Sequence, residues 1–328
     1  MKEANIPNGR MKMKIWGISN GSKGSDIQLE AISRALSQDV SYFHANLSFP
    51  WSAVAPYKMA ELGVVGDKRF KPPFPDMVIA CGRRAVPVAR SLKRRSAGKC
   101  FTVFLQNPII NPKVFDFVWA PAHDLVSGDN VATTILGPHG LTHDILKIEA
   151  ASWQKRLSPS IVNGKIVGIL IGGPNKYYDF DKLEMQNLAS NLLMLAQQGH
   201  RLIISLSSRS RDDYVNILRK TLADHDYYLW HGIGDNPYKA ILGIADHLIV
   251  TGDSVNMIGE ACFPGVPVQV YFLRGHSGRF NRFYEHLLAG NYVKPFEGKL
   301  ESWDYEPRNA TDDIVAKILD AYHEHQIK

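Results

Sequence analysis

The sequence has no apolar run of about 18 residues, so it lacks the signature of a membrane-spanning helix. It has only three cysteines, Cys81, Cys100 and Cys262, and their spacing matches no metal site. An odd number of such residues fits reduced, buried thiols in a cytosolic protein better than a disulfide framework. The stretch Met1–Lys12 is polar and lacks the apolar core of a secretory signal. We therefore expect a cytoplasmic protein.

Motifs of several enzyme classes are also missing. The sequence contains no Walker loop and no H-E-x-x-H zinc motif. Its first glycine-rich turn, from Ser19 to Gly24, departs from the G-x-G-x-x-G dinucleotide fingerprint. These absences argue against a P-loop NTPase, a zinc protease and an NAD-dependent enzyme. We expect no metal and no cofactor.

The net charge of +6 is unevenly distributed. Up to Pro159 the chain carries 21 Lys and Arg against 12 Asp and Glu, and beyond it 17 against 20. Such asymmetry suggests that the first half meets something anionic. The densest basic run is either a solvated helix face or a surface that docks to an anionic membrane. Aromatic residues are not interleaved with these charges, so we expect no nucleic-acid partner. The run comprises Arg83, Arg84, Arg90, Lys93, Arg94, Arg95 and Lys99.

Apolar runs that alternate with helical periodicity predict an α/β protein with two doubly wound parallel sheets. We place the domain boundary in the connector between Ala151 and Gly164. The expected domains are a basic, acceptor-side Rossmann-like domain at 1–155 and a second Rossmann-like domain at 160–300. A helix within 301–328 is expected to pack back on the first domain. The expected strands lie near 14–18, 40–43, 77–80, 100–105, 117–119, 165–171, 201–206, 227–230, 248–250 and 266–271.

The segment around 248–261 carries the strongest functional signal. An apolar run ends at Val250, a polar turn follows from Thr251 to Ser254, and a helix is predicted after it. The backbone N–H groups at the start of such a helix bind anions. We predict that this turn binds a pyrophosphate and that Glu260, further along the helix, accepts hydrogen bonds from a ribose diol. The alternative is that Asp253 or Ser254 only caps the helix and that Glu260 is solvated.

Other strands of the second half also end in small or polar residues, which places several candidates at one edge of the sheet. The forked guanidinium of Arg209 suits a diphosphate, although it could instead bond loop carbonyls. Asn236 either lies near the nucleoside base or begins a helix. The predicted substrate-binding residues are Gly172, Gly173, Arg209, Asn236, Thr251, Ser254, Val255, Asn256, Met257 and Glu260.

Candidates for a general base lie in the first half. Asp26 follows the glycine-rich turn, and His123 and Asp124 follow a predicted strand. Any of the three could deprotonate an acceptor hydroxyl. The alternatives are helix capping for Asp26 and a loop hydrogen-bond network for the other two. Because these residues and His139 lack metal-ligand spacing, we expect catalysis without a metal.

Several of these residues fall in motifs that resemble the mitochondrial fission (elongated-mitochondria) family of plant proteins and bacterial relatives. The resemblance covers about Met13–Phe296 and is most specific between Thr251 and Glu260. It implies a GT-B-like fold, in which two Rossmann-like domains face each other across a cleft. It also implies pyrophosphate at the helix start and ribose on Glu260. Since no transit peptide is recognisable, we expect a bacterial member of the family. The motifs are Pro121-x-His123-Asp124, Gly172-Gly173, Ser208-Arg209, Gly234-x-Asn236-Pro237-Tyr238 and Val250-Thr251-x-Asp253-Ser254-x-Asn256-Met257-x-x-Glu260-Ala261.

We therefore expect a metal-independent GT-B-type glycosyltransferase. It would move a sugar from a nucleoside-diphosphate sugar to a lipid-linked or saccharide acceptor at the cytoplasmic face of the inner membrane. An anionic lipid partner would account for the basic first half, and the contact with the membrane would be peripheral. Two alternatives stay open. One is a non-catalytic membrane-surface adaptor with a relic nucleotide pocket, and the other is a nucleotide-sugar epimerase that uses no NAD.

Overall fold

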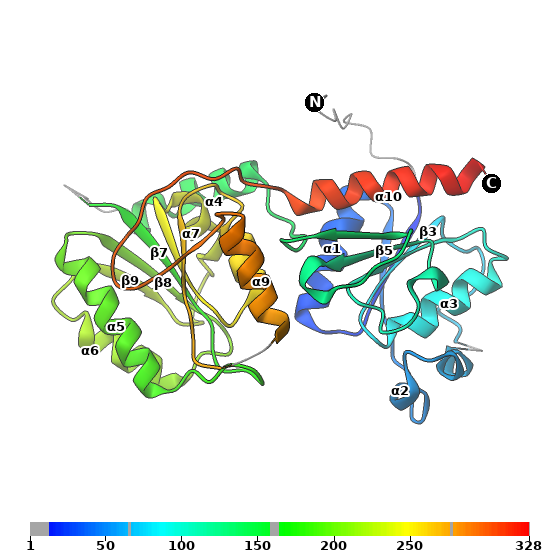
Figure 1. Cartoon of the computed structure of the whole chain (residues 1–328), viewed down its shortest axis with the longest axis horizontal. Helices are drawn as coiled ribbons and strands as arrows, with labels where there is room; N and C mark the ends of the chain where they lie inside the picture. Colours follow the sequence, from blue (N-terminus) through cyan, green and yellow to red (C-terminus); the bar gives the residue numbers. More distant parts are fainter. Residues whose placement is uncertain (1–12, 65–66, 158–163, 276–277, 328) are drawn as a thin grey trace. The chain divides into compact units, whose positions relative to one another are not determined.

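The computed structural model describes residues 13–64, 67–157, 164–275 and 278–327. The chain divides into two compact units (Figure 1). Unit 1 contains Met1–Gly140 and Asn309–Lys328, and unit 2 contains Leu141–Arg308. The chain therefore passes from unit 1 to unit 2 and returns to unit 1 for its last helix.

Unit 1 is built on a six-stranded parallel sheet with the order β2-β1-β3-β4-β5-β6. Four of its strands, β1, β3, β4 and β5, are buried along their whole length. Strands covered on both faces need apolar residues at every position, which is why they appear in the sequence as unbroken apolar runs. The strands are β1 (Ile15–Ser19), β2 (Val40–His44), β3 (Met77–Cys81), β4 (Phe101–Leu105), β5 (Phe117–Pro121) and β6 (Val131–Thr134).

Helices pack on this sheet (Figure 1). α1 (Lys23–Leu36) contacts β1, β3 and α10 (Ala310–Ile327), and α10 also contacts β4, β5 and β6. α3 (Ala85–Arg95) packs on β1, β3 and β4. Beyond α3 lie α2 (Trp51–Val54) and the 3₁₀ helix η1 (Lys58–Val64), which contacts α3. Two shorter 3₁₀ turns are η2 (Pro112–Val114) and η3 (Ala122–Asp124).

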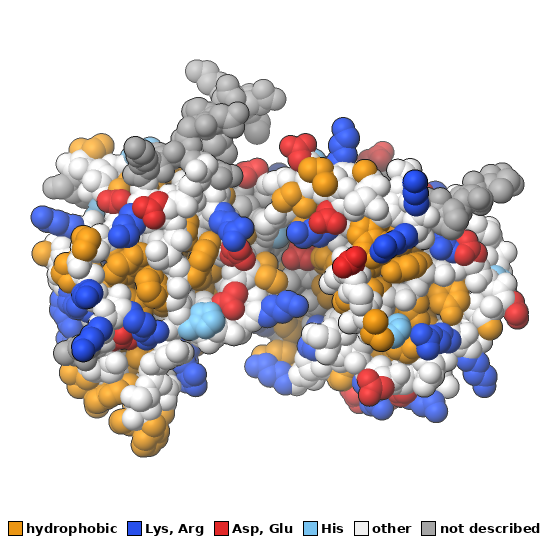
Figure 2. All heavy atoms as spheres, turned by 180° about the vertical axis from the view of Figure 1, so that it is seen from behind, with side chains coloured by type: hydrophobic (Ala, Val, Ile, Leu, Met, Phe, Trp, Pro, Cys, Tyr) orange, Lys and Arg blue, Asp and Glu red, His pale blue; other side chains and the backbone are white. Residues whose placement is uncertain are grey.

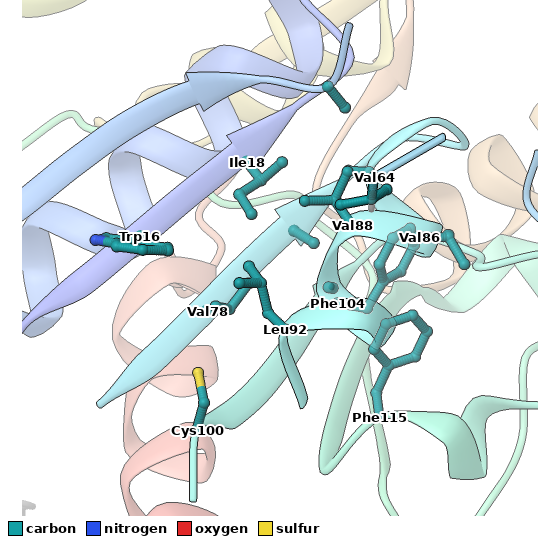
Figure 3. Packing of buried hydrophobic residues seen from close by; sticks show 14 of the residues in the cluster. Trp16, Ile18, Val64, Val78, Val86, Val88, Leu92, Cys100, Phe104 and Phe115 are labelled. Atoms are coloured by element: carbon teal, nitrogen blue, oxygen red, sulfur yellow. The ribbon is translucent and has the colours of Figure 1, made fainter. Parts of the chain in front are cut away.

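The core of unit 1 follows from the alternation of side chains along its strands. Trp16 of β1 and Phe104 of β4 belong to the cluster around Leu92 of α3 (Figure 3). Phe101, three positions before Phe104, faces the other side of β4 and packs on Tyr322 of α10, with 5.5 Å between ring centroids. The two faces of the sheet are thus covered by α3 and by α10.

Unit 2 is built on a second parallel sheet with the order β12-β11-β10-β7-β8-β9. The prediction of two Rossmann-like α/β domains is confirmed. The strands are β7 (Ile166–Ile171), β8 (Arg201–Leu206), β9 (Tyr227–Trp230), β10 (His247–Thr251), β11 (Val268–Tyr271) and β12 (Lys294–Pro295). The helices are α4 (His143–Leu157), α5 (Lys182–Gln197), α6 (Asp212–Thr221), α7 (Tyr238–Ile244), α8 (Val255–Ala261) and α9 (Gly278–Ala289).

The order of the strands shows where the winding of each sheet reverses, which is where open α/β sheets generally bind ligands. In unit 2, β7, β8 and β9 extend the sheet in one direction, and β10, β11 and β12 extend it in the other. The winding therefore reverses between β7 and β10, and ligands of open α/β sheets bind outside the carboxyl ends of the strands at such a point. In unit 1 the reversal lies between β1 and β3.

The structure differs from the sequence prediction at the domain boundary. Residues 143–157 form a single helix, α4, which packs on α7 and belongs to unit 2. The boundary therefore falls at Gly140 and Leu141, earlier than the connector between Ala151 and Gly164 that we predicted from the sequence. The sequence analysis also missed β6, β12, α2, α6, α9 and the 3₁₀ helices η1, η2 and η3. Apart from α6 and α9, these elements are short, so their residues show too few periods to be recognised.

Each unit contains a histidine that burial keeps neutral. Burial lowers the pKa of His139 in unit 1 to about 4, and it lowers the pKa of His247 in unit 2 to about 4. The ring of His247 is paired with the side chain of Gln269, with 2.8 Å between Nε2 and Oε1. In the unfolded chain a histidine binds a proton below about pH 6.5. The unfolded state therefore takes up more protons than the folded state between about pH 6.5 and pH 4.

We therefore expect the stability of both units to be complete above about pH 6.5 and to fall as the pH drops toward 4. Each histidine should lower the free energy of unfolding by about 2 kcal/mol at pH 5 relative to neutral pH. Urea titrations across this range measure the effect. His139→Gln and His247→Gln should each flatten the pH dependence, and His323→Ala, at an exposed position, should not. An unchanged slope in both glutamine variants would contradict the assignment.

Candidate functional site

The loops after β7 and β10 meet at the carboxyl edge of the unit 2 sheet, because these two strands are neighbours. The N–H of Gly172 donates to Oγ1 of Thr251 at 2.8 Å, and the N–H of Gly173 donates to Oδ2 of Asp253 at 3.1 Å. The side-chain amide of Asn175 donates to the carbonyl oxygen of Asp253 at 3.1 Å. Two backbone N–H groups and one side-chain amide of the β7 loop are therefore bonded to acceptors of the β10 turn.

Asp253 organises this edge of the sheet. Its side chain is completely buried, and its Oδ2 also accepts a hydrogen bond from Nη2 of Arg209 at 2.6 Å. Its Oδ1 accepts one from the hydroxyl of Thr251 at 2.7 Å. One carboxylate thus joins the loops that follow β7, β8 and β10. Asp253 was not among the predicted binding residues. The sequence analysis named it only as a possible helix cap.

The two glycines after β7 are required by space. A Cβ on Gly172 would lie 2.0 Å from Oδ2 of Asp253, and a Cβ on Gly173 would lie 2.0 Å from the carbonyl oxygen of Arg209. Both distances are far inside van der Waals contact. The predicted anion-capable turn is therefore a close approach of three loops that leaves no room for side chains at 172 and 173.

Arg209 makes the loop contacts that the sequence analysis gave as the alternative to diphosphate binding. Its Nη1 donates to the carbonyl oxygen of Gly173 at 3.3 Å, and its Nη2 binds Asp253. The side chain nevertheless stays 40% exposed. A guanidinium has five N–H donors in a fixed fork. The same group can therefore hold the loops and present a positive charge at the edge of the sheet.

The helix after the β10 turn begins with a serine cap. The Oγ of Ser254 accepts a hydrogen bond from the N–H of Met257 at 3.3 Å, so the capping role expected as an alternative is present. Val255, Asn256 and Met257 form the first turn of α8, and all three are partly exposed. This turn carries backbone N–H groups at the carboxyl edge of the sheet.

Glu260 is bonded to a tyrosine of a neighbouring helix. Its Oε2 accepts a hydrogen bond from the hydroxyl of Tyr238 at 2.5 Å. Burial, together with the charge of Glu260, raises the pKa of Tyr238 well above its usual value. Asn236 is exposed, and its Oδ1 accepts from the N–H of Tyr238 at 3.0 Å, so it fixes the start of α7. A carboxylate accepts several hydrogen bonds, so the bond from Tyr238 is compatible with a further donor from a ribose.

A hollow of about 410 Å³ lies beside these loops in unit 2. It is lined by residues 174–179, Arg274 and Gly275, and so borders the same turn that bonds Asp253. Small-molecule sites span about 300–1,000 Å³. Lys176 and Arg274 add cations that the sequence analysis did not predict. A larger hollow of about 680 Å³ lies in unit 1 between α10 and the amino ends of β4 to β6, at the edge opposite to the one that binds ligands in such sheets.

The three predicted base candidates occupy different positions in unit 1. Asp26 lies in the first turn of α1, next to the reversal point between β1 and β3. Burial, with a smaller contribution from the nearby charge of Asp26, raises the pKa of the Cys81 thiol to about 12, which places Asp26 near the end of β3. His123 is only 2% exposed, and its Nε2 lies 3.8 Å from Oδ1 of Asp124.

The structure does not group these candidates around one point. Asp26 follows β1, whereas His123 and Asp124 follow β5, and β3 and β4 lie between those strands. Three strand spacings amount to roughly 14 Å. Asp26 is partly exposed at the reversal point, which is the position expected for a ligand-contacting residue, whereas His123 is buried.

A serine in unit 1 has the spacing of a nucleophile elbow, Gly17-Ile18-Ser19-Asn20-Gly21. Ser19, however, is the last residue of β1 and is buried, and its Oγ accepts a hydrogen bond from the N–H of Gly21 at 3.0 Å. The nucleophile of an elbow is exposed on a sharp turn between strand and helix. The geometry of Ser19 is therefore that of a turn-stabilising residue.

Three further observations concern metal ligands, membrane-spanning helices and cysteines. Among the residues that the structure describes, no group of three or more His, Cys, Asp or Glu could hold a metal ion. No described helix is both long and apolar enough to cross a bilayer. The three cysteines are free and buried, as predicted.

The sequence model of the family described as "Mitochondrial fission ELM1" matches residues 23–322. The chain belongs to the mitochondrial fission ELM1 family. This match confirms the family resemblance and includes every predicted site residue of both units.

Two curated proteins are similar in sequence to the ELM1 member described here. The mitochondrial fission protein ELM1 of Arabidopsis thaliana is 27% identical over 271 residues, which cover 74% of this chain and 63% of the plant protein. The chain thus spans less than two thirds of the length of that relative. The uncharacterized protein RP120 of Rickettsia prowazekii (strain Madrid E) is 25% identical over 360 residues, covering 94% of this chain and 98% of RP120.

Solved structures place this ELM1 member in the GT-B fold. The UDP-GlcNAc 2-epimerase of Methanocaldococcus jannaschii matches with a TM-score of 0.60 and 12% identity, covering 94% of this chain and 99% of that one. MurG of Acinetobacter baumannii matches with a TM-score of 0.54 and 13% identity, covering 96% and 94%. The UDP-GlcNAc 2-epimerase of Neisseria meningitidis, bound to UDP-GlcNAc, matches with 0.54 and 14%, covering 94% and 100%. The predicted GT-B-like class is confirmed.

Proposed function

We propose that this member of the ELM1 family is a metal-independent glycosyltransferase of the GT-B type. It would transfer a sugar from a nucleoside-diphosphate sugar to a lipid-linked or saccharide acceptor at the cytoplasmic face of the membrane. The observation that supports this most strongly is the arrangement around Asp253. Loops after β7, β8 and β10 meet there, at the reversal point where sheets of this order bind ligands.

Each predicted binding residue has a role in this proposal. The N–H groups of Val255, Asn256 and Met257 and the exposed side of Arg209 would bind the diphosphate. Glu260 would accept hydrogen bonds from the ribose hydroxyls, held in place by Tyr238. The remaining predicted residues shape the site: Gly172, Gly173 and Thr251 set the approach of the loops, Ser254 caps α8, and Asn236 fixes the start of α7 beside the base.

The acceptor would be bound by the basic unit 1. Asp26 is its best-placed base, because it is partly exposed at the reversal point between β1 and β3. The carboxylate would take the proton of an acceptor hydroxyl as that oxygen bonds to the anomeric carbon and the nucleoside diphosphate leaves. His123 and Asp124 would not contact the acceptor themselves. They would only position the loop that follows β5. The cation of Arg209 would balance the charge that develops on the leaving diphosphate.

Replacing Glu260 tests the binding site directly. Glu260→Ala should raise the dissociation constant for a nucleoside diphosphate by about 10-fold or more, because hydrogen bonds to a charged group contribute about 1.5–3 kcal/mol. Isothermal titration calorimetry measures this change. Glu297→Ala, at an exposed carboxylate of the same unit, is the matched control. Tyr238→Phe should give a smaller loss, since the carboxylate remains. Unchanged affinity in Glu260→Ala would contradict the assignment.

Nucleotide-sugar epimerisation is the second candidate, favoured by the UDP-GlcNAc 2-epimerases among the structural neighbours, such as those of Methanocaldococcus jannaschii and Neisseria meningitidis. Incubation with UDP-GlcNAc in the absence of any acceptor separates the two reactions. An epimerase converts the donor to an isomer under these conditions, whereas a transferase needs an acceptor for rapid turnover. An adaptor with a relic pocket would bind nucleotide and yield neither product.

A further inference from the structure

The segment between β2 and β3 exposes large hydrophobic side chains on a defined surface. Phe49, Tyr57, Met59 and Leu62 are between 58% and 85% exposed. Among the described residues, other hydrophobic side chains that are more than half exposed occur singly along the chain. We call these four residues the α2–η1 surface. Figure 2 shows hydrophobic side chains gathered there, at the lower left. Exposed apolar patches of this kind mark interaction sites.

The element that carries this surface is firmly attached to the rest of unit 1. Glu61 of η1 is buried and binds two arginines of α3, with 3.1 Å from Oε1 to Nε of Arg90 and 2.6 Å from Oε2 to Nη1 of Arg94. Val64 of η1 belongs to the hydrophobic core. A Cβ on Gly63 would lie 2.6 Å from the ring of Trp51, so α2 packs closely on η1. The contacts on the inner side of α2 and η1 account for how this segment folds. They do not account for the large hydrophobic side chains exposed on its outer side.

The surroundings of the α2–η1 surface are strongly basic. Between Ser48 and Cys100 the chain carries 11 Lys and Arg against 3 Asp and Glu, a larger excess than that of the whole protein. One of the three acids, Glu61, is buried and paired, and a second, Asp67, is paired with Arg69 at 2.6 Å. Lys58 lies within the surface itself, between Tyr57 and Met59.

This charge pattern distinguishes a lipid surface from a protein partner. Lysine is depleted in the cores of protein–protein interfaces, whereas elements that lie in a membrane interface combine apolar side chains with Lys and Arg around them. Lys58, Lys68, Lys71 and Arg95 are all exposed, and Arg95 follows Arg94, which contacts η1. Aromatic and long apolar side chains would enter the acyl boundary while these cations meet head groups.

We propose that the α2–η1 surface is a docking site for an anionic lipid bilayer. Phe49, Tyr57, Met59 and Leu62 insert into the interfacial layer, and Lys58 and the neighbouring cations bind the phosphate head groups. The basic run on α3, for which the sequence left open a solvated face or a membrane-docking surface, contributes less, because Arg90 and Arg94 are paired with Glu61 and Lys93 with Asp116. The docking is independent of the reaction that unit 2 supports, so it is tested without nucleotide.

Vesicle flotation with the full chain tests the proposal. The protein should float with equimolar phosphatidylcholine–phosphatidylglycerol vesicles at low salt and remain largely unbound to pure phosphatidylcholine. The variant Phe49→Ser/Met59→Ser/Leu62→Ser should lower the partition coefficient by about tenfold or more, since three inserted side chains are lost. The control Ile148→Ser/Ile233→Ser removes hydrophobic side chains of unit 2 that are 69% and 75% exposed, and it should bind like the wild type.

Two further measurements keep the proposal falsifiable. Lys58→Ala/Lys68→Ala/Lys71→Ala should weaken binding to anionic vesicles and reduce its salt dependence. Phe49→Trp should bind normally, and its fluorescence should be quenched by brominated acyl chains. The proposal is overturned if the wild type does not float with anionic vesicles, or if the triple serine variant floats as well as the control. Sedimentation that shows a dimer lost in the triple serine variant, without any vesicle binding, would assign the surface to a second copy of the chain.

Discussion

Asp253→Ala should abolish measurable binding of nucleoside diphosphates and lower the free energy of unfolding of unit 2. The buried carboxylate accepts hydrogen bonds from the N–H of Gly173, the hydroxyl of Thr251 and the guanidinium of Arg209. Removing one partner of a buried ion pair costs about 3–5 kcal/mol, and because Arg209 is partly exposed we expect about 2–3 kcal/mol here. Since the three loops that form the proposed site share this one acceptor, the dissociation constant should rise by about 100-fold or more.

The same two strands supply a matched control for Asp253. At the opposite edge of the sheet, Oδ2 of Asp246 accepts a hydrogen bond from the N–H of Ile166 at 2.8 Å. Asp246→Ala therefore removes a carboxylate that joins β10 to β7 but lies away from the proposed site. Calorimetry should show normal nucleotide affinity in this variant. If Asp246→Ala and Asp253→Ala weakened binding equally, the loss would reflect general destabilisation, and the site would not be where we place it.

Gly173→Ala should have an effect of similar size for a steric reason. The added Cβ would lie 2.0 Å from the carbonyl oxygen and 2.4 Å from the carbonyl carbon of Arg209. These are backbone atoms, so the loops after β7 and β8 would have to separate. Overpacking a tight site costs about 1–3 kcal/mol, and we expect the upper end of that range together with loss of nucleotide binding. Thermal unfolding and calorimetry measure both effects.

Gly278→Ala is the control for the glycine variant. Gly278 begins α9 in the same unit, and the nearest atom to an added Cβ, the tip of the Arg282 side chain, is 3.9 Å away. We expect wild-type affinity and unchanged or slightly higher stability, because alanine favours a helix more than glycine does. A Gly173→Ala protein with a normal melting temperature and normal affinity would show that the loops are not packed as described.

The sequence predicted at which edge of the sheet the small and polar residues gather, but it did not predict how that edge is bonded. Apolar runs that end in Gly172-Gly173 and in Thr251-Gly252-Asp253 indicate strands followed by polar turns. The bond between Gly173 and Asp253 depends on β7 and β10 being neighbours, although about 80 residues separate them. Pairing over such a distance is a property of the fold, and a single sequence contains no direct signal for it. Asp253 therefore looked like an ordinary helix cap.

The other errors of the sequence analysis concern the α2–η1 segment and the domain boundary, where local sequence patterns contain too little information. The α2–η1 segment combines a helix of four residues with a 3₁₀ helix of seven, too short for helical periodicity to be visible. The sequence analysis therefore assigned no element to this segment and did not identify its outward apolar residues. The connector near 155 was misplaced because α4 is stabilised by packing on α7, a tertiary contact. Tyr238 could have been included, since it lies in the Asn236-Pro237-Tyr238 motif that the sequence analysis identified.

The return of the chain to unit 1 affects the order in which the protein can fold on the ribosome. Ile314 and Ile318 of α10 are fully buried in unit 1, and Tyr322 packs on Phe101. These residues are translated only after all of Leu141–Arg308 has been made. Unit 2 can therefore reach its native state while unit 1 still exposes the apolar face of β4 that α10 covers. The second half of the molecule can thus mature before the first, and we expect the nascent first half to be the part that needs protection from aggregation.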